Sequence, residues 1–523
     1  MSLAQLLRTK PPAQLIAEAE ASPHQMKKTL TALDLIAFGV GATIGSGIFA
    51  LTGTAAAGQA TIHQDVMSTP IINFILGSPL GREGAGPAIV ISFLIAALAC
   101  GFAAMCYAEL AAMIPVSGSA YTFAYAALGE LVAWIIGWDL ILEYAVGNIA
   151  VAVSWSDYFQ NVLTGITGLK LPLWLACDPH TAMVRLEAIK SDPSIASMYS
   201  SIDVPAINGM LMSMNVPAFL IVVLITFVLV VGVQESAWVN SVAVILKVAV
   251  VIFFVLFGIA YVHPENWHPF APTGFAGIMG GAAIVFFSFI GFDAVSSTAE
   301  ETKNPQRDMP VGMLGSLAIC TILYAAVSLV LTGILPYQQY ANDAAPVATA
   351  IAATKQPWAH IFVSIGALAG MTSVLLVFQL GQPRIFMAMA RDGLLPKMFS
   401  ILHPKYKTPF VPTVLTGLFV GFAALFIDIG FAAELTNIGT LAAFIIVCGG
   451  VLVLRKSDPD HVRPFKCPLV PLVPALGIFS CFVLMLSLPL NTWVRFVVWM
   501  GLGGLLYWAY GYRNSKLAKP KSE

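Results

Sequence analysis

Charged side chains are scarce in this sequence. Only 10% of its 523 residues are Asp, Glu, Lys or Arg, whereas 58% are hydrophobic, and the mean hydropathy is +0.84. A soluble globular protein has about 25% charged residues. The composition therefore excludes a soluble domain and predicts a polytopic integral membrane protein whose surroundings are the lipid bilayer.

Other absences narrow the function. The net charge is −1 and the sequence has no basic patch, so it gives no sign of a nucleic-acid partner. We find no nucleophile–base–acid set, metal-ligand spacing or phosphate loop, which argues against an enzyme and against a cofactor. Of the seven cysteines, only Cys177 falls in a predicted external loop, so we expect neither a disulfide framework nor a metal cluster.

Long apolar runs dominate what is present. A spanning helix needs about 20 apolar residues, and twelve runs meet or approach this length: 31–57, 86–113, 130–162, 216–233, 237–262, 274–300, 308–335, 357–390, 409–427, 431–455, 467–488 and 491–512. They predict an all-α integral membrane fold of twelve transmembrane helices.

The segments outside these runs are polar. Residues 1–28 lack the continuous apolar core of a signal peptide, so we expect a cytoplasmic tail or a short helix on the membrane surface. We expect an insertion at 58–85 and an irregular external cap at 164–215. Far more Lys and Arg fall on one predicted side than on the other, which places both termini in the cytoplasm.

The first run is interrupted by glycines. Gly41–Phe49 reads GATIGSGIF, and glycine disfavours a continuous helix. In lipid, such a break survives only where the protein buries it or it lines a cavity. The second half of the helix would present free amides at its N-terminus, which bind anions. We therefore predict that a carboxylate is bound by Thr43, Ile44, Gly45, Ser46 and Gly47.

The sixth run is interrupted as well, in the sequence FFSFIGFD at 286–293. Carbonyl groups before this break would accept hydrogen bonds from an ammonium group, and we assign this role to Phe287, Ser288 and Ile290. Glycines in one span alone indicate close helix packing equally well. Two interrupted spans at corresponding positions indicate an inverted repeat with the substrate between them. The predicted repeats are 29–262 and 274–455, followed by two extra helices in 467–512 and a tail at 513–523.

Five stretches together resemble the amino acid–polyamine–organocation permeases, in particular the bacterial relatives of the cationic amino acid transporters. They are 41–49, 107–121, 290–293, 300–307 and 390–396. The resemblance implies the five-plus-five (LeuT-like) inverted-repeat fold with broken helices 1 and 6. It also implies import of amino acids across the cytoplasmic (inner) membrane.

Lys247 lies deep in the apolar stretch Val242–Phe257. A charge at such depth is a functional candidate by default. In the family members that this chain resembles, a lysine on helix 5 stands where sodium-driven relatives hold a cation. The resemblance thus implies that Lys247 ties helix 5 to broken helix 1 and serves proton coupling. A structural lysine in a fixed salt bridge is the alternative.

Two carboxylates also lie deep in predicted spans. Asp293 follows the second break and is a candidate for proton coupling or for holding helix 6 to a neighbour. Glu143, one turn from Asp139, is a candidate for the side-chain pocket, where it would favour a cationic substrate. Internal hydrogen bonds would explain both equally well. By resemblance, Met371 closes the pocket and leaves room for small neutral amino acids, although core packing would also suit it.

These features predict a secondary active transporter that imports neutral or broad-specificity L-amino acids together with protons by alternating access. An exchanger, a carrier of cationic amino acids and a non-transporting amino acid sensor of the same fold remain alternatives. The sequence does not reveal whether a small accessory membrane subunit is a partner.

Overall fold

The computed structural model describes residues 8–20, 28–58, 66–116, 118–191, 193–207, 210–231, 237–341, 343–406 and 408–517. The regular secondary structure of this part is helical apart from one antiparallel pair of two-residue strands, β1 (Ala206–Ile207) and β2 (Met210–Leu211). The predicted all-α class is confirmed.

Eight stretches of the described chain are long and apolar enough to cross a membrane, if a bent pair of helices counts as one. The bent pair is α3 (Ala32–Thr43) with η1 (Gly47–Leu51) and α4 (Thr52–Ala57). The other seven are α6 (Ile89–Met113), α8 (Glu130–Thr167), α12 (Ala237–Gly258), α13 to η7 (Gly274–Glu301), α14 (Pro305–Ile334), α16 (Pro357–Arg391) and α18 (Ile429–Ser457).

The other predicted runs form shorter apolar helices. These are α11 (Val216–Val231), α17 (Phe410–Ala424), α19 (Leu472–Leu486) and α20 (Leu490–Leu506). Every predicted run is therefore helical. The number of twelve crossings and the inverted repeat stay predictions.

Short helices lie between the spans. The segment 164–215, expected to be an irregular cap, contains α9 (Leu173–Ala176), α10 (Pro179–Ser191) and the 3-10 helix η3 (Pro193–Met198) and so is partly helical. The Asp178 carboxylate accepts a hydrogen bond from the Thr181 amide at 2.9 Å and so starts α10. The insertion contributes α5 (Ile71–Leu76), and α7 (Ser119–Ala127) and α15 (Pro346–Ala353) lie elsewhere between the spans. Shorter helical turns are η2 (Gly86–Ala88), η4 (Ile259–Tyr261), η5 (Pro264–Trp267), η8 (Tyr337–Tyr340), η9 (Lys397–Ser400), η10 (Tyr507–Gly511) and α21 (Tyr512–Asn514).

The N-terminal segment is docked on the protein. Residues Pro12–Glu20 form α2, and its Leu15 is buried. The Lys10 amide donates to the Tyr125 carbonyl at 3.1 Å, and the Lys10 ammonium lies 3.5 Å from the Asp392 carboxylate. This part of the segment is therefore a helix packed on the protein, and its predicted place on the cytoplasmic membrane surface stays a prediction.

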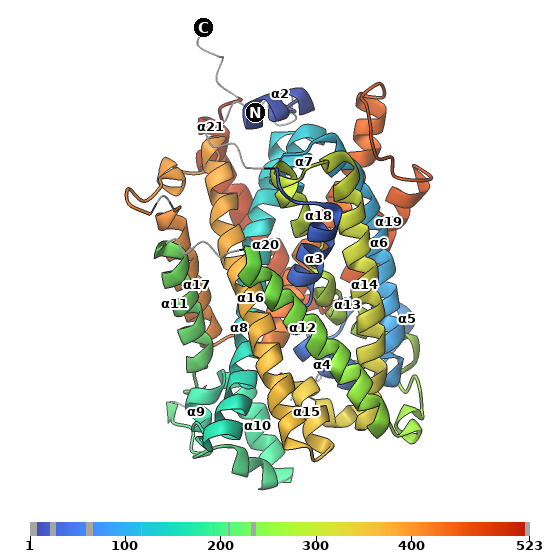
Figure 1. Ribbon diagram of the computed structural model, residues 1–523, viewed down its shortest axis with the longest axis vertical. Helices are drawn as coiled ribbons and strands as arrows, with labels where there is room; N and C mark the ends of the chain where they lie inside the picture. Colours follow the sequence, from blue (N-terminus) through green and yellow to red (C-terminus); the bar gives the residue numbers. More distant parts are fainter. Residues whose placement is uncertain are drawn as a thin grey trace.

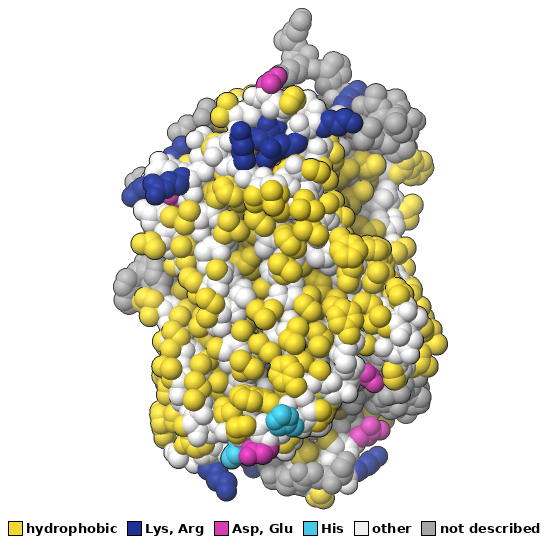
Figure 2. Space-filling model, turned by 90° about the vertical axis from the view of Figure 1, so that its right-hand side faces the viewer, with side chains coloured by type: hydrophobic (Ala, Val, Ile, Leu, Met, Phe, Trp, Pro, Cys, Tyr) yellow, Lys and Arg dark blue, Asp and Glu magenta, His cyan; other side chains and the backbone are white. Residues whose placement is uncertain are grey.

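The elements form an elongated bundle. The short helices α3 and α13 lie inside it, surrounded by longer helices (Figure 1). Both chain ends lie at one end of the bundle, and α9 and α10 lie at the other. Figure 2 shows a broad hydrophobic belt with basic side chains gathered above it at the end that carries the chain ends. This distribution is typical of a membrane protein, in which charged side chains stay outside the hydrocarbon layer.

Candidate functional site

The first predicted break is confirmed. Helix α3 ends at Thr43, Ile44 is extended with φ −74° and ψ 99°, and the helix resumes at Gly47 after a bend of 41°. Among the backbone hydrogen bonds of the described residues, none uses the amide of Gly45 or Ser46. Both amides are therefore available to a ligand.

The second predicted break is confirmed as well. Helix α13 ends at Val285, and a single 3-10 turn, η6 (Phe286–Phe289), follows it. Ile290 is extended with φ −62° and ψ 131°. Gly291 has φ +120°, a conformation that residues with a side chain rarely adopt, so glycine is required at this point of the break.

The two breaks touch each other through glycine. A Cβ atom built on Gly47 would overlap the Cα atom of Ser288 and lie 2.8 Å from its Cβ. A Cβ built on Gly291 would lie 2.8 Å from the carbonyl carbon of Ala42 and 3.1 Å from the Thr43 nitrogen. The backbones of the first and sixth predicted spans therefore meet at both breaks.

Polar groups at this junction are only partly satisfied. The hydroxyls of Ser46 and Ser288 are buried, and neither has a hydrogen-bond partner among the described residues. Such groups are uncommon in proteins because each costs about 1–3 kcal/mol. The Phe287 carbonyl already accepts a hydrogen bond from the Ile290 amide at 3.2 Å, so only one of its lone pairs remains for an ammonium group.

Lys247 of α12 is fully buried and points at the first break. Its ammonium donates to the carbonyl of Gly41 and, at 3.3 Å, to the carbonyl of Ile44. These carbonyls belong to the end of α3, where a helix leaves acceptors without partners and where its dipole favours a cation. The predicted link between the fifth run and the broken first span is thus present, and it uses carbonyl groups and no carboxylate.

Three side chains that the sequence analysis missed hold the breaks from other helices. The Tyr324 hydroxyl of α14 donates to the Thr43 carbonyl at 3.0 Å, and the Tyr158 hydroxyl of α8 donates to the Phe49 carbonyl at 2.7 Å. The Asn437 amide of α18 donates to the Ala283 carbonyl at 2.7 Å. Asn437 stands alone as an amide inside a hydrophobic run, which is the signal that would have identified it.

The deep carboxylates take different places. The Asp293 carboxylate accepts a hydrogen bond from the Gly291 amide at 3.2 Å and so stabilises the second break. Glu143 lies near Thr440 of α18 and close enough to Asp293 for the two carboxyl groups to interact. The side chain of Asp139 faces Gly439, which also lies in α18. Glu143 thus lies near the second break, although no described hydrogen bond joins it to a residue of either break.

Met371 and the phenylalanines border the junction. Met371 is fully buried, and its sulfur accepts a hydrogen bond from the Ser154 hydroxyl at 3.1 Å. Its neighbour Gly370 faces Lys247, whose Cβ would be 3.2 Å from a Cβ built on that glycine. Phe286 packs edge-to-face against Phe444 of α18, with ring centres 5.7 Å apart.

Phe289 is also committed to packing. Its ring centre lies 5.3 Å from that of Tyr324 and 6.2 Å from that of Phe93. Because Phe286 and Phe289 both pack against neighbouring helices, Phe287 is the one of the three whose ring is not placed in such a pair within the described residues. All of the break residues are buried, so the junction is closed to both sides in this conformation.

Comparison with known proteins agrees with this geometry. The sequence profile described as "Amino acid permease" matches residues 30–507. The chain belongs to the amino acid permease family. It is 45% identical over 512 residues to the branched-chain amino acid permease BcaP of Bacillus subtilis. The match covers 98% of this chain and 99% of the relative.

Two further relatives show the breadth of the family. The permease is 42% identical over 517 residues to the methylthioribose transporter of Bacillus subtilis, covering 99% of this chain and all of the relative. It is 37% identical over 449 residues to the vacuolar cationic amino acid transporter 4 of Arabidopsis thaliana, covering 84% of this chain and 65% of the relative. These relatives are named as transporters and permeases.

Proposed function

We propose that this protein is a secondary active transporter that imports neutral or broad-specificity L-amino acids with protons by alternating access. The observation that carries the proposal is the junction of the two breaks. Two unwound spans meet there, with free amides at Gly45 and Ser46 and an unpartnered hydroxyl at Ser288. A zwitterion suits this arrangement, because amides bind its carboxylate and carbonyl groups bind its ammonium.

The proposed substrate contacts need no charged side chain. The carboxylate would lie at the start of the second half of the broken first span, near Ser46 and Gly47. The ammonium would lie at the end of η6, near the carbonyls of Phe287, Ser288 and Ile290. We propose Met371 as the residue that limits substrate size. Glu143 lies toward α18 and is a weaker candidate for the substrate pocket.

Proton coupling is assigned to Lys247 and Asp293. The contact of Lys247 with the carbonyls of Gly41 and Ile44 supports this assignment, because these acceptors belong to the element that must move when the site opens. Loss of the Lys247 proton would remove the charge that holds α12 to α3. Asp293, whose carboxylate accepts a hydrogen bond from the Gly291 amide, lies on the second broken span itself.

The proposed location is the cytoplasmic (inner) membrane, with both termini in the cytoplasm. The basic side chains gathered at the end that carries the termini support this orientation (Figure 2). The five-plus-five repeat is part of the same proposal.

The test is uptake into proteoliposomes that contain the purified protein. Labelled leucine, alanine, arginine and methylthioribose are offered with and without an inward proton gradient. The proposal expects saturable uptake of neutral amino acids that the gradient accelerates. Counterflow without gradient dependence would indicate an exchanger, arginine preference a cationic carrier, and binding without counterflow a sensor.

A further inference from the structure

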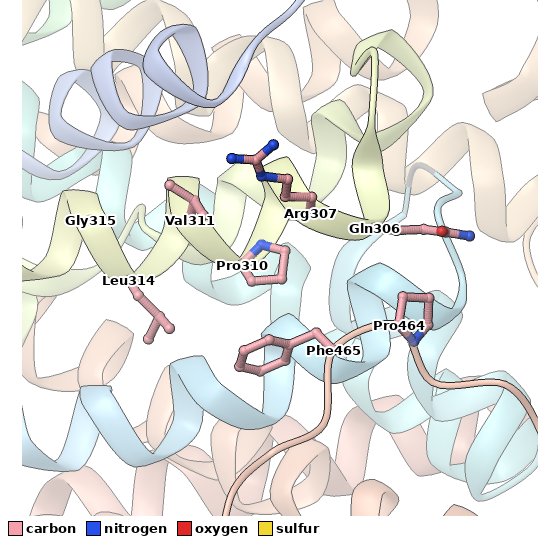
Figure 3. Close-up of a pocket in the computed structure, with 8 residues that line it drawn as sticks. All are labelled: Gln306, Arg307, Pro310, Val311, Leu314, Gly315, Pro464 and Phe465. Atoms are coloured by element: carbon pink, nitrogen blue, oxygen red, sulfur yellow. The ribbon is translucent and has the colours of Figure 1, made fainter.

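A cavity of about 750 Å³ lies on the outer face of the bundle, away from the two breaks (Figure 3). Helix α14 lines one side with Gln306, Arg307, Pro310, Val311, Leu314 and Gly315, and the loop between α18 and α19 supplies Pro464 and Phe465. Nothing in the proposed transport cycle uses these residues.

The cavity is polar at one end and apolar along its length. Arg307 and Gln306 lie in the first turn of α14, whereas Val311 and Leu314 lie one and two turns further along the helix. Since a helix rises 1.5 Å per residue, roughly 10 Å separate Arg307 from Leu314 along the axis. This gradient of polarity matches an amphiphile whose head lies at Arg307.

The apolar end continues onto the lipid-facing side of α14. Val311, Ile319 and Ile322 are 44%, 40% and 70% exposed, and their spacing places them on one face of the helix. An acyl chain that leaves the cavity would therefore follow an uninterrupted apolar stripe. Figure 2 shows the molecule from the side on which α14 lies, where the hydrophobic belt meets the basic end.

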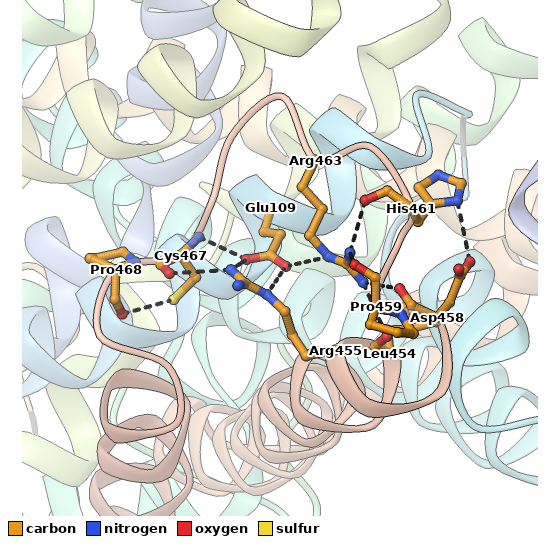
Figure 4. A network of polar contacts seen from close by, with 9 residues as sticks. All are labelled: Glu109, Leu454, Arg455, Asp458, Pro459, His461, Arg463, Cys467 and Pro468. Atoms are coloured by element: carbon orange, nitrogen blue, oxygen red, sulfur yellow. Dashed lines mark hydrogen bonds and ion pairs between the residues drawn. The ribbon is translucent and has the colours of Figure 1, made fainter.

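The wall opposite α14 is held rigidly. Arg463 donates to the carbonyls of Leu454, Asp458, Pro459 and His461, and its guanidinium lies 3.3 Å from the Glu109 carboxylate of α6. Glu109 also accepts from the Cys467 amide at 2.7 Å and from Arg455 (Figure 4). Pro464 and Phe465 lie between these two anchored points, so the cavity is preformed.

The charge at the polar end is positive. Of the described residues that line the cavity, Arg307 carries the charge, and the neighbouring Asp308 is buried and is not among them. Besides Arg307, two exposed lysines lie nearby in sequence: Lys303 is four residues before it, and Lys466 directly follows Phe465. Guanidinium groups bind phosphate with paired hydrogen bonds. We infer that this cavity binds one anionic phospholipid, with the phosphate at Arg307 and an acyl chain along Val311 and Leu314. This inference does not rest on the proposed transport function.

The test is lipid binding to the purified full-length protein in detergent, followed by native mass spectrometry and by thermal unfolding. Dioleoyl phosphatidylglycerol, dioleoyl phosphatidylcholine and glycerol 3-phosphate are titrated separately. We expect one phosphatidylglycerol to be retained and to raise the melting temperature, with much weaker effects of phosphatidylcholine and of the free headgroup. Equal effects of the two lipids would overturn the inference.

Two variants address the two ends of the cavity. Arg307→Gln removes the charge, and loss of a charged hydrogen bond predicts a roughly ten-fold or larger weakening of phosphatidylglycerol binding. Val311→Trp fills the apolar channel from a half-exposed position and should weaken binding similarly. Arg513→Gln, an exposed arginine at the same end of the bundle, is the matched control and should bind normally.

Unchanged phosphatidylglycerol binding by both cavity variants would refute the lipid site and leave the cavity to a protein partner. Strong binding of glycerol 3-phosphate without the lipid would indicate a site for free phosphate compounds, which would also refute it. Thermal unfolding of each variant without lipid shows whether it folds. A misfolded variant is replaced by Arg307→Lys, which keeps the charge and should lose only the paired hydrogen bonds.

Discussion

Gly47 lies directly against Ser288, so closely that a Cβ atom on the glycine would overlap the Cα atom of the serine. Because these residues belong to the two broken spans, the contact sets the distance between the donors of one break and the acceptors of the other. A junction of this kind tolerates little change in size on either side.

Gly47→Ala is expected to abolish amino acid binding. The added methyl group must push the two breaks apart, and such overpacking typically costs about 1–3 kcal/mol of stability. Substrate-dependent thermal stabilisation and proteoliposome uptake measure the effect. Gly101→Ala in α6 is the control, because a Cβ there meets no atom within 4 Å. Normal uptake by Gly47→Ala would disprove the close junction.

Lys247→Met should separate proton coupling from substrate exchange. The variant removes the ammonium group that donates to the Gly41 and Ile44 carbonyls. Residue 247 can then no longer gain or lose a proton. We expect gradient-driven uptake to fall to background while some counterflow persists. Lys516→Met, an exposed lysine at the end that carries the termini, should behave as the wild type. Unchanged gradient-driven uptake in Lys247→Met would refute its coupling role.

Asn437→Ala should weaken substrate binding without contacting the substrate. The Asn437 side chain donates to the carbonyls of Ala283 and Ile284 and so fixes the last turn of α13 before the second break. Loss of these buried hydrogen bonds predicts about 1–3 kcal/mol of destabilisation. Thermal unfolding and titration with the preferred amino acid measure both effects. Thr321→Ala in α14, a half-buried residue that bonds only within its own helix, is the control.

Met371→Ser should broaden the range of accepted amino acids. The shorter side chain leaves space beside Gly370 and Lys247, so bulkier substrates should compete better for uptake. Met389→Ser is a matched control in the same helix, because both methionines are fully buried and roughly 27 Å separates them along the axis. An unchanged competition profile for Met371→Ser would remove its role as a size filter.

Asp178, at the start of α10, predicts a pH dependence of stability. Burial raises the pKa of its carboxyl, and the charge of Asp428 raises it further, while the bonds from Thr181 oppose both effects. The folded protein thus favours the protonated form, so this contribution to stability is present at low pH and is lost as the pH rises through the folded pKa.

Asp178→Asn keeps the acceptor for the Thr181 amide and removes the charge. We expect a higher melting temperature than the wild type at neutral pH, and a smaller difference at acidic pH. Thermal unfolding across this pH range measures both. Asp203→Asn, an exposed carboxylate in the same outer segment, should follow the wild type. A wild-type pH profile in Asp178→Asn would contradict the effect.

Much of the fold could be predicted because it depends on local properties of the chain. The lengths of the apolar runs decide where helices lie, and the glycines near Ser46 and Ile290 decide where two of them break. The depth of Lys247 was equally visible, since an isolated charge in an apolar run needs no partner to be noticed. The segment 164–215 was expected to be irregular because its helix α10 has no strong hydrophobic pattern.

Only the tertiary structure decided which groups meet. The Gly41 carbonyl that accepts from Lys247 lies 206 residues away in the sequence, and no local pattern encodes such a pairing. Packing likewise committed Phe286 and Phe289 to neighbouring helices and turned Glu143 toward α18. The sequence by itself determined the membrane class and the positions of the breaks, because these follow from hydrophobicity and backbone freedom. The contacts between the breaks depend on how the helices pack in space.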